Sequence, residues 1–403
     1  MTGQTAATRP GGWPADPVAA VTHPDPYPYY ARLVAERPLY RDEALGLWVA
    51  SGHAAVMAVM TDAACRVRPP SEPVPKAIVG SPAADIFRHL VRMNDGAIHC
   101  PFKQAVTATL GSINATRLAA TACERAAVLA ARHAPQRDRQ DLTRFIFAFP
   151  VGVVARLLGV PDVHVDDAAG WVQRYVAAVS PLADAAALEA GKQGARQLID
   201  LFCHVLDDHQ RTQSDGLLGL LARKVVATGH GPIEPIIANS IGFMTQAYEA
   251  TAALIGSTLL ALADHDDARA AVRRDPALID AAVSEVLVID PPTHSTRRFL
   301  AHDAVVAGQA MRTGDAILVL LAAAGRDPAA NPDCGRFNIF RQQRRILNFG
   351  AGVHACPADS LAARIASFAV AHLLDIGLDL DRLRDSLSYM PSVAVRAPRF
   401  GVG

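Results

Sequence analysis

The stretch FGAGVHACPADS, at residues 349–360, constrains this chain more than any other feature of its sequence. Pro357 follows Cys356, and proline is favoured at the first position of a helix because its missing N–H would have no partner there. An apolar-periodic run continues at residues 361–370, so we expect Cys356 at a helix N-terminus, where the dipole and free amides favour a thiolate. The two glycines before it permit a tight turn and a close approach to a flat group. The pattern favours an axial iron ligand over a buried structural cysteine, which is the usual role of an isolated thiol.

Most of the remaining chain predicts helices, because Ala-rich segments carry apolar residues at three- and four-residue spacing. Helices are expected at residues 116–132, 160–179, 188–208 and 246–263, and strands at 45–51, 304–312 and 315–324. Residues 1–24 are rich in Pro and Gly and predict an irregular arm. No repeat or long linker divides residues 25–403, so we expect a mainly α protein with a minor sheet, in one domain.

Composition and charge argue against several classes of protein. The 403 residues carry 39 Lys and Arg against 39 Asp and Glu, and this balance predicts neither nucleic acid nor an anionic membrane as a partner. No apolar run approaches the length of a membrane span, and the N-terminus lacks the apolar core of a signal peptide. We therefore expect a soluble, cytoplasmic protein. The six cysteines form no CxxC pair, which disfavours a disulfide framework or a structural zinc site.

Five segments of the chain stand in an order that points to one family. Phe349, Gly352, His354 and Cys356 fit the string FxxGxHxC. The other segments are DPYPYYARLVAERPLY, IHCPFK, EVLVIDPPTHSTRR and AAAGRDPAANPD. Together they resemble the haem loop, N-terminal helix, helix C, helix K and following connection of the cytochrome P450 family, in its bacterial, soluble, ferredoxin-dependent type. The resemblance runs from about Asp25 to the C-terminus.

The resemblance implies a triangular, mostly helical fold with small β-sheets that holds haem b between a distal and a proximal helix. Cys356 would be the proximal iron ligand, because a thiolate pushes electron density to iron and favours O–O cleavage. Phe349 would pack beside its sulfur. The haem propionates would be bound by four cationic side chains: His99, Lys103, Arg298 and His354. The first two share one helix face at i, i+4 spacing, and cations of this kind pair well with carboxylates.

The distal helix departs from the family's pattern. Most members carry a small residue, a glycine, any residue, an acid and a threonine where this chain has QAYEA. Glu249 keeps the acid, whereas Ala250 replaces the threonine that usually helps to hold dioxygen and deliver protons. Thr251 lies about 100° further round the helix and is expected to bond back to it. Gln246 shares a face with Ala250, and two roles stay open for its amide: a hydrogen bond in the distal site, or one to a helix carbonyl or other distant group.

Two further departures concern the proximal side. The family's helix K carries Glu-x-x-Arg, which joins an arginine of the later meander in a buried ion network. Glu285 is present, but Val288 replaces the arginine, so that either Glu285 pairs with Arg336 or the core is repacked with apolar side chains. Because buried charges need partners, we expect a less secure network. Ala358 replaces the glycine usually found two residues after the cysteine, which adds one methyl group near the haem.

The implied activity is that of a haem-thiolate monooxygenase, which oxidises a small organic molecule with O2 and two electrons from a ferredoxin. Glu249, with Gln246 and Thr251, is the candidate catalytic set that would deliver protons. Two alternatives stay open. Peroxide-driven oxidation, nitration or dehydration would fit the loss of the alcohol at Ala250, and a haem-binding relative with little turnover would fit Val288.

The substrate and the electron donor are expected at two further sets of residues. The candidate substrate contacts are Phe243, Ala247, Thr293 and Ser295, which together are apolar with isolated polar groups, as is typical of a small-molecule site. Arg341, Arg344 and Arg345 precede the cysteine loop and would form a basic face for an acidic ferredoxin. A run of solvated arginines is the alternative interpretation of these three residues.

Overall fold

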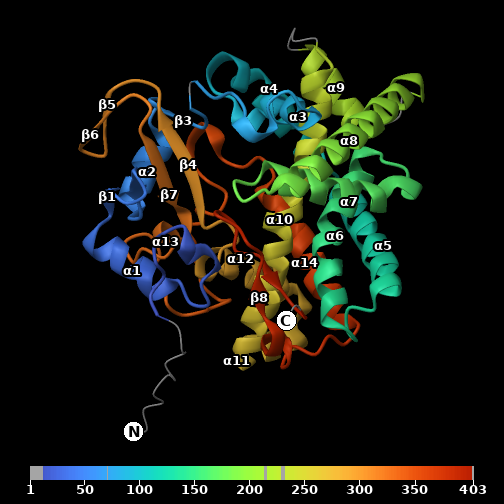
Figure 1. Cartoon of the computed structure of the whole chain (residues 1–403). Helices are drawn as coiled ribbons and strands as arrows, with labels where there is room; N and C mark the ends of the chain where they lie inside the picture. The colour runs from blue at the N-terminus through green and yellow to red at the C-terminus, as the bar shows by residue number, and fades with distance from the viewer. Residues whose placement is uncertain (1–11, 70, 213–215, 228–231, 402–403) are drawn as a thin grey trace.

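Figure 1 shows the computed structural model, which describes residues 12–69, 71–212, 216–227 and 232–401. Helices make up most of it; most of the labelled strands gather at one side together with α1 and α2, whereas β8 lies among the helices near the C-terminus (Figure 1). The helices are α1 (Tyr27–Glu36), α2 (His53–Thr61), α3 (Pro82–His89), α4 (Gly96–Leu110), α5 (Ala115–His133), α6 (Arg139–Leu158), α7 (Asp162–Val179), α8 (Ala185–Thr212), α9 (Leu217–Ala227), α10 (Glu234–Asp264), α11 (Asp266–Arg274), α12 (Ile279–Ile289), α13 (Leu321–Gly325) and α14 (Asp359–Asp375). The predicted mainly α fold is confirmed. In the part of the chain described, no helix combines the length and the apolar character that a membrane span requires.

Most expected elements form near their predicted positions. The helices expected at 116–132 and 160–179 are α5 and α7, and the one expected at 188–208 lies inside the longer α8. The helix expected at 246–263 is the second half of α10, because the preceding apolar residues continue the same buried pattern. The strand expected at 315–324 ends at Leu320, since the Ala-rich residues after it form α13.

A five-stranded sheet lies beside the helical body (Figure 1). Its strands, in spatial order, are β1 (Leu39–Asp42), β2 (Leu47–Ala50), β7 (Ala316–Leu320), β4 (Ser295–Leu300) and β3 (Cys65–Arg66). β2 and β7 are parallel, and the other neighbouring pairs are antiparallel. Two small sheets pair β5 (Ala304–Val306) with β6 (Gln309–Met311), and β8 (Ser388–Tyr389) with β9 (Pro398–Arg399). The sheet fixes β4, the strand that carries Arg298.

α10 runs through the middle of the molecule and packs against α3, α6, α12 and α14 (Figure 1). Its 31 residues are apolar nearly all round, as expected of a helix that has neighbours on every side. From residue 235 to residue 260, four side chains keep accessible surface: Phe243, Gln246, Glu249 and Ala250. The candidate distal residues therefore form the one accessible stripe in the middle of a buried helix.

The described start of the chain is tied to its C-terminal segment by a buried charge. Arg396 is 2% exposed and donates to the carbonyls of Val21 and His23. Its Nε lies 3.3 Å from Oδ1 of Asp290, which also accepts a hydrogen bond from Tyr27. Of the expected arm 1–24, residues 12–24 include a short 3-10 turn, η1 (Ala19–Thr22), and residues 1–11 lie outside the described chain.

Candidate active site

The cysteine loop is held in a tight turn by its two glycines. Gly350 and Gly352 have φ angles of 71° and 67°, which side-chain-bearing residues rarely adopt. A Cβ at Gly352 would lie 2.8 Å from the carbonyl oxygen of Met60, so the loop passes directly over the end of α2. The Cys356 N–H donates to the Phe349 carbonyl at 2.8 Å and closes the turn. The glycines therefore fix the place at which the thiol is presented.

The helix after the cysteine begins later than the sequence predicts. α14 begins at Asp359, so Cys356 lies in the loop and Pro357 in a turn before the helix. One amide, that of Ala358, lies 3.4 Å from the sulfur. Burial raises the pKa of the Cys356 thiol, and this amide and the Lys103 ammonium oppose the rise only in part. The prediction that the helix begins directly after Cys356 is therefore wrong, and a bound metal cation would favour the thiolate.

Four basic side chains from three separate elements are the candidates beside the loop. His99 and Lys103 lie on α4, Arg298 lies on β4, and His354 ends the 3-10 turn η5 (Gly352–His354). The rings of His99 and His354 are 4.4 Å apart between centroids, and Lys103 donates to the Ala355 carbonyl. The structure thus brings together three of the four residues that the resemblance assigns to the propionates, and the fourth, Arg298, is linked to them through Asp95, which acts on its charge and lies against His354.

The polar groups of this cluster are buried and incompletely paired. Nε2 of His99 and Nδ1 of His354 have no hydrogen-bond partner among the residues described. Arg298 is 4% exposed, and its side chain donates within its own strand, to Thr296 Oγ1 at 3.4 Å and the Arg297 carbonyl at 2.8 Å. Burial and the neighbouring cations lower the pKa of His99 to about 4. Donors that lack acceptors favour the arrival of an anionic group.

This donor set fits a haem with its two carboxylates. Among the described residues, no three His, Cys, Asp or Glu side chains form a group that could hold a metal ion. Iron bound at Cys356 would therefore need its other ligands from a prosthetic group. A haem brings four ring nitrogens and two propionates, and propionates pair with cations such as Arg298 and Lys103.

The accessible stripe of α10 borders an internal space. Phe243, Gln246, Glu249 and Ala250 recur at three- and four-residue spacing and so lie on one face. The other faces are covered by neighbouring helices, among them α14, which follows the cysteine loop. Ala247, at the edge of the stripe, is 9% exposed. The stripe is therefore the surface of α10 that a substrate or a cofactor would meet.

Glu249 has the properties of a proton-transfer group. Burial raises its pKa to about 7, and the charge of Arg92 opposes that rise. A carboxyl group with such a pKa both holds and releases a proton near neutral pH. Thr251 is 3% exposed, and its hydroxyl has no hydrogen bond to the residues described, so the expected bond back to its own helix is absent.

Gln246 takes the second of its two expected roles. Its Nε2 donates to the Gly242 carbonyl at 2.9 Å, one turn earlier on the same face. A glutamine can reach this carbonyl because residues four apart lie above one another on a helix. The amide N–H is therefore occupied within α10, although the side chain itself remains exposed.

The candidate substrate contacts differ in the accessibility of their side chains. Phe243 and Thr293 keep accessible surface. Ser295 is 4% exposed, and its hydroxyl donates to the Val393 carbonyl at 3.0 Å. This hydroxyl is therefore bonded to the backbone of the C-terminal segment. The Thr293 N–H donates to Asn348 Oδ1 at 2.8 Å, which ties this residue to the start of the cysteine loop.

The helix K carboxylate is paired with different arginines from the one expected. Glu285 is completely buried and lies 3.0 Å from Arg341 and 2.9 Å from Arg344. The Asn338 N–H also donates to its Oε1 at 3.1 Å. Arg336 contributes only its carbonyl, which accepts from Arg341 at 3.0 Å. The expected Glu285–Arg336 pair is therefore wrong, because the meander folds back and carries two later arginines to the carboxylate.

The same pairing removes most of the expected basic face. The side chains of Arg341 and Arg344 are 10% and 16% exposed and are committed to Glu285, so they are neither a solvated run nor a free docking surface. Of the three arginines, Arg345 alone is exposed. Val288 is completely buried, so apolar packing fills the position of the missing helix K arginine.

The sequence alone does not predict three residues of the site: Asp95, Arg92 and Tyr175. Asp95 Oδ1 lies 2.9 Å from His354 Nε2 and joins the propionate cluster. Arg92 acts electrostatically on Glu249, and Tyr175 on α7 acts on Arg92. Two sequence features could have indicated them. Arg92 is a single cation in the apolar run LVRM, and Asp95 stands directly before α4.

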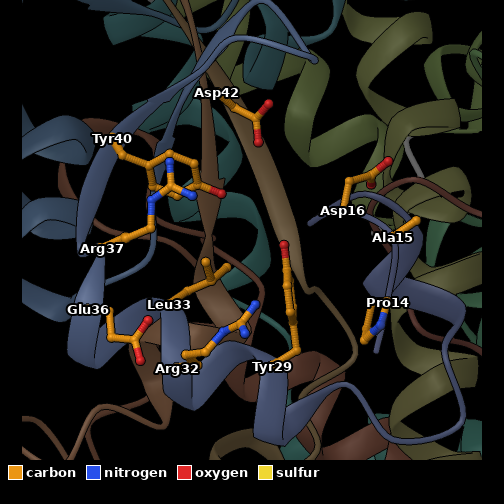
Figure 2. Close-up of a pocket in the computed structure, with 10 residues that line it drawn as sticks. All are labelled: Pro14, Ala15, Asp16, Tyr29, Arg32, Leu33, Glu36, Arg37, Tyr40 and Asp42. Carbon is orange, nitrogen blue, oxygen red and sulfur yellow. The ribbon is translucent and has the colours of Figure 1, made fainter. Parts of the chain in front are cut away.

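A separate hollow lies at the surface near the N-terminal helix (Figure 2). It has a volume of about 320 Å³ and is lined by residues between Pro14 and Asp42, among them Tyr29 and Arg32. None of the candidate site residues lines it. It is therefore distinct from the space beside α10.

Comparison with known proteins agrees with this geometry. Residues 184–375 match the sequence profile of the family described as Cytochrome P450. The chain is 28% identical over 383 residues to cytochrome P450 monooxygenase PikC of Streptomyces venezuelae, which covers 92% of this chain and 89% of that protein. It is 29% identical over 245 residues to 6-deoxyerythronolide B hydroxylase of Saccharopolyspora erythraea, of which it spans 59%, with 59% of this chain covered.

A solved structure shows the same fold. P450BioI in complex with an acyl carrier protein that carries hexadec-9Z-enoic acid superposes with a TM-score of 0.80, at 24% identity, over 93% of this chain and 98% of that chain. The sequence match, this fold and the thiol loop with its cationic cluster agree with one another. The chain therefore has the cytochrome P450 fold and is similar to that family in sequence over residues 184–375.

Proposed function

We propose that the protein is a haem b monooxygenase that oxidises a small organic molecule with O2 and two electrons from a ferredoxin. The observation that carries this proposal is the thiol of Cys356, fixed in a glycine turn beside a cluster of basic side chains in which buried nitrogens of His99 and His354 have no partner among the described residues. The bound haem would supply the oxidising chemistry, favoured by a thiolate ligand. His99, Lys103, Arg298 and His354 would hold its propionates, and Phe349 would pack beside the sulfur. Residues 25–403 would form the haem domain.

Proton delivery is assigned to Glu249. Its pKa of about 7 and its place on the accessible stripe of α10 allow it to hold a proton and give it up to the distal space. Gln246 would help to orient water near this stripe through its free amide oxygen. Thr251 would contribute less, because it is buried one residue beyond the stripe.

The ferredoxin would contact the proximal side, at the cysteine loop. Of the three arginines expected there, two are committed to Glu285 and Arg345 remains exposed. Val353 lies on the loop two residues before Ala355 and is 69% exposed, so it offers an apolar contact close to the thiol. An apolar centre with a small charged rim suits a transient protein interface.

One observation favours a second candidate function. In this alternative, a P450-type enzyme uses peroxide or carries out another reaction that needs little controlled proton delivery. Ala250 places a methyl group, not an alcohol, on the accessible stripe, and the N–H of Gln246 is occupied by Gly242. Turnover with NADPH, a surrogate ferredoxin and its reductase would support the monooxygenase. Turnover with hydrogen peroxide alone would support the second candidate.

The test of the central assignment is spectroscopic. The purified protein should bind haem b, and its reduced carbon monoxide complex should absorb at the long-wavelength Soret position typical of thiolate ligation. Cys356→Ser should abolish that band, whereas Cys334→Ser, at a thiol that donates to the Arg326 carbonyl, should preserve it. An unchanged thiolate spectrum in Cys356→Ser would show that the assignment is wrong.

A further inference from the structure

Arg92 occupies a turn that is fixed directly on α10. The turn is η3 (Val91–Met93), which follows α3. The buried side chain of Asn239 on α10 accepts from the Val91 N–H at 2.8 Å and donates to the His89 carbonyl at 2.9 Å. These two bonds hold the backbone on both sides of Leu90. The position of Arg92 beside α10 is therefore set by buried hydrogen bonds.

The same turn lies next to the accessible stripe. A Cβ at Gly242 would lie 2.7 Å from Cδ2 of Leu90, so the chain before Arg92 packs tightly against α10 one turn before Gln246. Arg92 keeps accessible surface, yet protein surrounds it closely enough for burial to lower its pKa. The surface that Arg92 exposes therefore faces the internal space and not bulk solvent.

The guanidinium of Arg92 has no acceptor of its own. It makes no hydrogen bond or ion pair with the residues that the structure describes, and the groups that act on it are Tyr175 and Glu249. Glu249 does not neutralise it fully, because burial keeps the pKa of that carboxyl near 7. A cation that is removed from water and lacks a hydrogen-bonded anion is costly, so the site favours an incoming anion.

Tyr175 supplies a second unpaired donor. It lies on α7, is 2% exposed, and its hydroxyl has no hydrogen-bond partner among the described residues. Burial raises its pKa, so it stays protonated and able to donate. Tyr175 and Arg92 act on each other electrostatically, so the two groups lie in the same region. The planar fork of Arg92 and the hydroxyl of Tyr175 offer donors of the kind that the two oxygens of a carboxylate accept from.

We propose that Arg92 and Tyr175 bind a carboxylate of the substrate, and that the enzyme oxidises a carboxylic acid whose remaining surface is apolar. This inference rests on the proposed function, because it concerns the same distal space. One guanidinium balances one negative charge, and the nearby Glu249 disfavours a doubly charged phosphate. Phe243 and Ala247 supply the apolar part of the stripe that would contact the rest of the molecule.

Arg92 and the propionate cluster are acted on by different groups. The charges that act on His99 come from His354, Lys103 and Asp95, whereas those that act on Arg92 come from α7 and α10. A haem propionate and a substrate carboxylate would therefore meet different cations. This separation makes the two roles distinguishable by experiment.

The test compares carboxylates with their uncharged counterparts. Straight-chain and aromatic carboxylates of six to sixteen carbons would each be paired with the primary amide of the same skeleton. Binding would be measured to the haem-loaded protein by calorimetry and by the shift of the Soret band. We expect at least one acid to bind at least about tenfold more tightly than its amide, as one charge-assisted bidentate contact allows.

The variants assign that preference to residues. Arg92→Gln should remove the preference for acids, Arg92→Lys should keep part of it, and Tyr175→Phe should reduce it several-fold. Arg88→Gln is the matched control, because Arg88 lies on the neighbouring helix with its side chain 47% exposed.

An absence of acid preference across the panel, or a preference that survives Arg92→Gln, would overturn the proposal. So would loss of haem with an unchanged acid preference, which would place Arg92 at a propionate. Calorimetry separates the two claims, because acid binding is measurable even if the thiolate spectrum fails.

Discussion

The buried Glu285 network offers the sharpest test of the structure, because it contradicts a simple interpretation of the sequence. Arg344 Nε lies 2.9 Å from Glu285 Oε2, and the carboxylate is completely buried. Arg344→Ala would remove one charge-assisted hydrogen bond from it, worth about 1.5–3 kcal/mol. Arg341 and the Asn338 amide would remain, so the loss should stay below the roughly 3–5 kcal/mol expected when a buried charge loses its only partner.

The neighbouring residue is a matched control. Arg345 is exposed, so Arg345→Ala should change the free energy of unfolding by less than about 0.5 kcal/mol. Urea unfolding of the haem-loaded protein, followed by circular dichroism and by the Soret band, would measure both variants. Equal effects of Arg344→Ala and Arg345→Ala would refute the assignment of Arg344 to Glu285.

Restoring the family's arginine at position 288 tests the same network from the other side. The oxygens of Glu285 already accept from Asn338, from Arg341 and from Arg344. A carboxylate has about four acceptor sites, so Val288→Arg would bring a cation that lacks a free acceptor into a fully buried position. We expect it to destabilise the protein, and the double variant Val288→Arg/Arg344→Ala to recover part of that loss. A stable Val288→Arg protein with no gain from the second substitution would show that the network has room for a third arginine.

The remaining predictions concern the distal and proximal sides. The pKa of Glu249 is raised from 4.5 to about 7, so its contribution makes the folded state less stable as pH rises from about 4.5 to about 7 and is constant at higher pH. Turnover should fall above pH 7 as the proton is lost. Glu249→Gln should flatten the pH dependence of both the unfolding free energy and the product rate. Gln246→Ala should leave the ratio of product to consumed NADPH within about twofold, since its N–H bonds to its own helix, whereas Ala250→Thr should raise that ratio several-fold; product and peroxide assays would measure both. Lys103→Ala should weaken haem retention during gel filtration, and unchanged retention would remove Lys103 from the propionate set.

The sequence predicts the proximal loop well because its chemistry is local. Two glycines with positive φ, the bond from Cys356 to Phe349 and the place of His354 all lie within eight residues. The position of the thiol therefore needs little information from the rest of the chain. The start of α14 was misplaced by two residues, because a proline that can begin a helix can equally occupy the turn before one.

The partners of Glu285 could not be predicted in this way. The meander has no regular period, so nothing in its sequence indicates which of its arginines turns back toward α12. Arg341 and Arg344 reach the carboxylate through a fold-back that also places carbonyls of residues 332–339 around them. Position along the chain pointed to Arg336, whereas the three-dimensional path of the meander selects its two later neighbours.

Arg92 was missed for a related reason, and its place has a consequence for Glu249. The sequence does not show that Asn239, almost 150 residues later, fixes the Arg92 turn on α10. In the structure the charge of Arg92 lowers the pKa of Glu249 and so opposes the effect of burial.

If a substrate carboxylate neutralises Arg92, that opposition weakens and the pKa of Glu249 rises further above about 7. Binding of an acid would thus load a proton on the residue that delivers it, whereas binding of the matching amide would not. The pH at which turnover falls should therefore be higher for the acid than for its amide, and Arg92→Gln should make the two profiles coincide. Profiles that coincide already in the unsubstituted enzyme would show that the two residues are not coupled through the substrate.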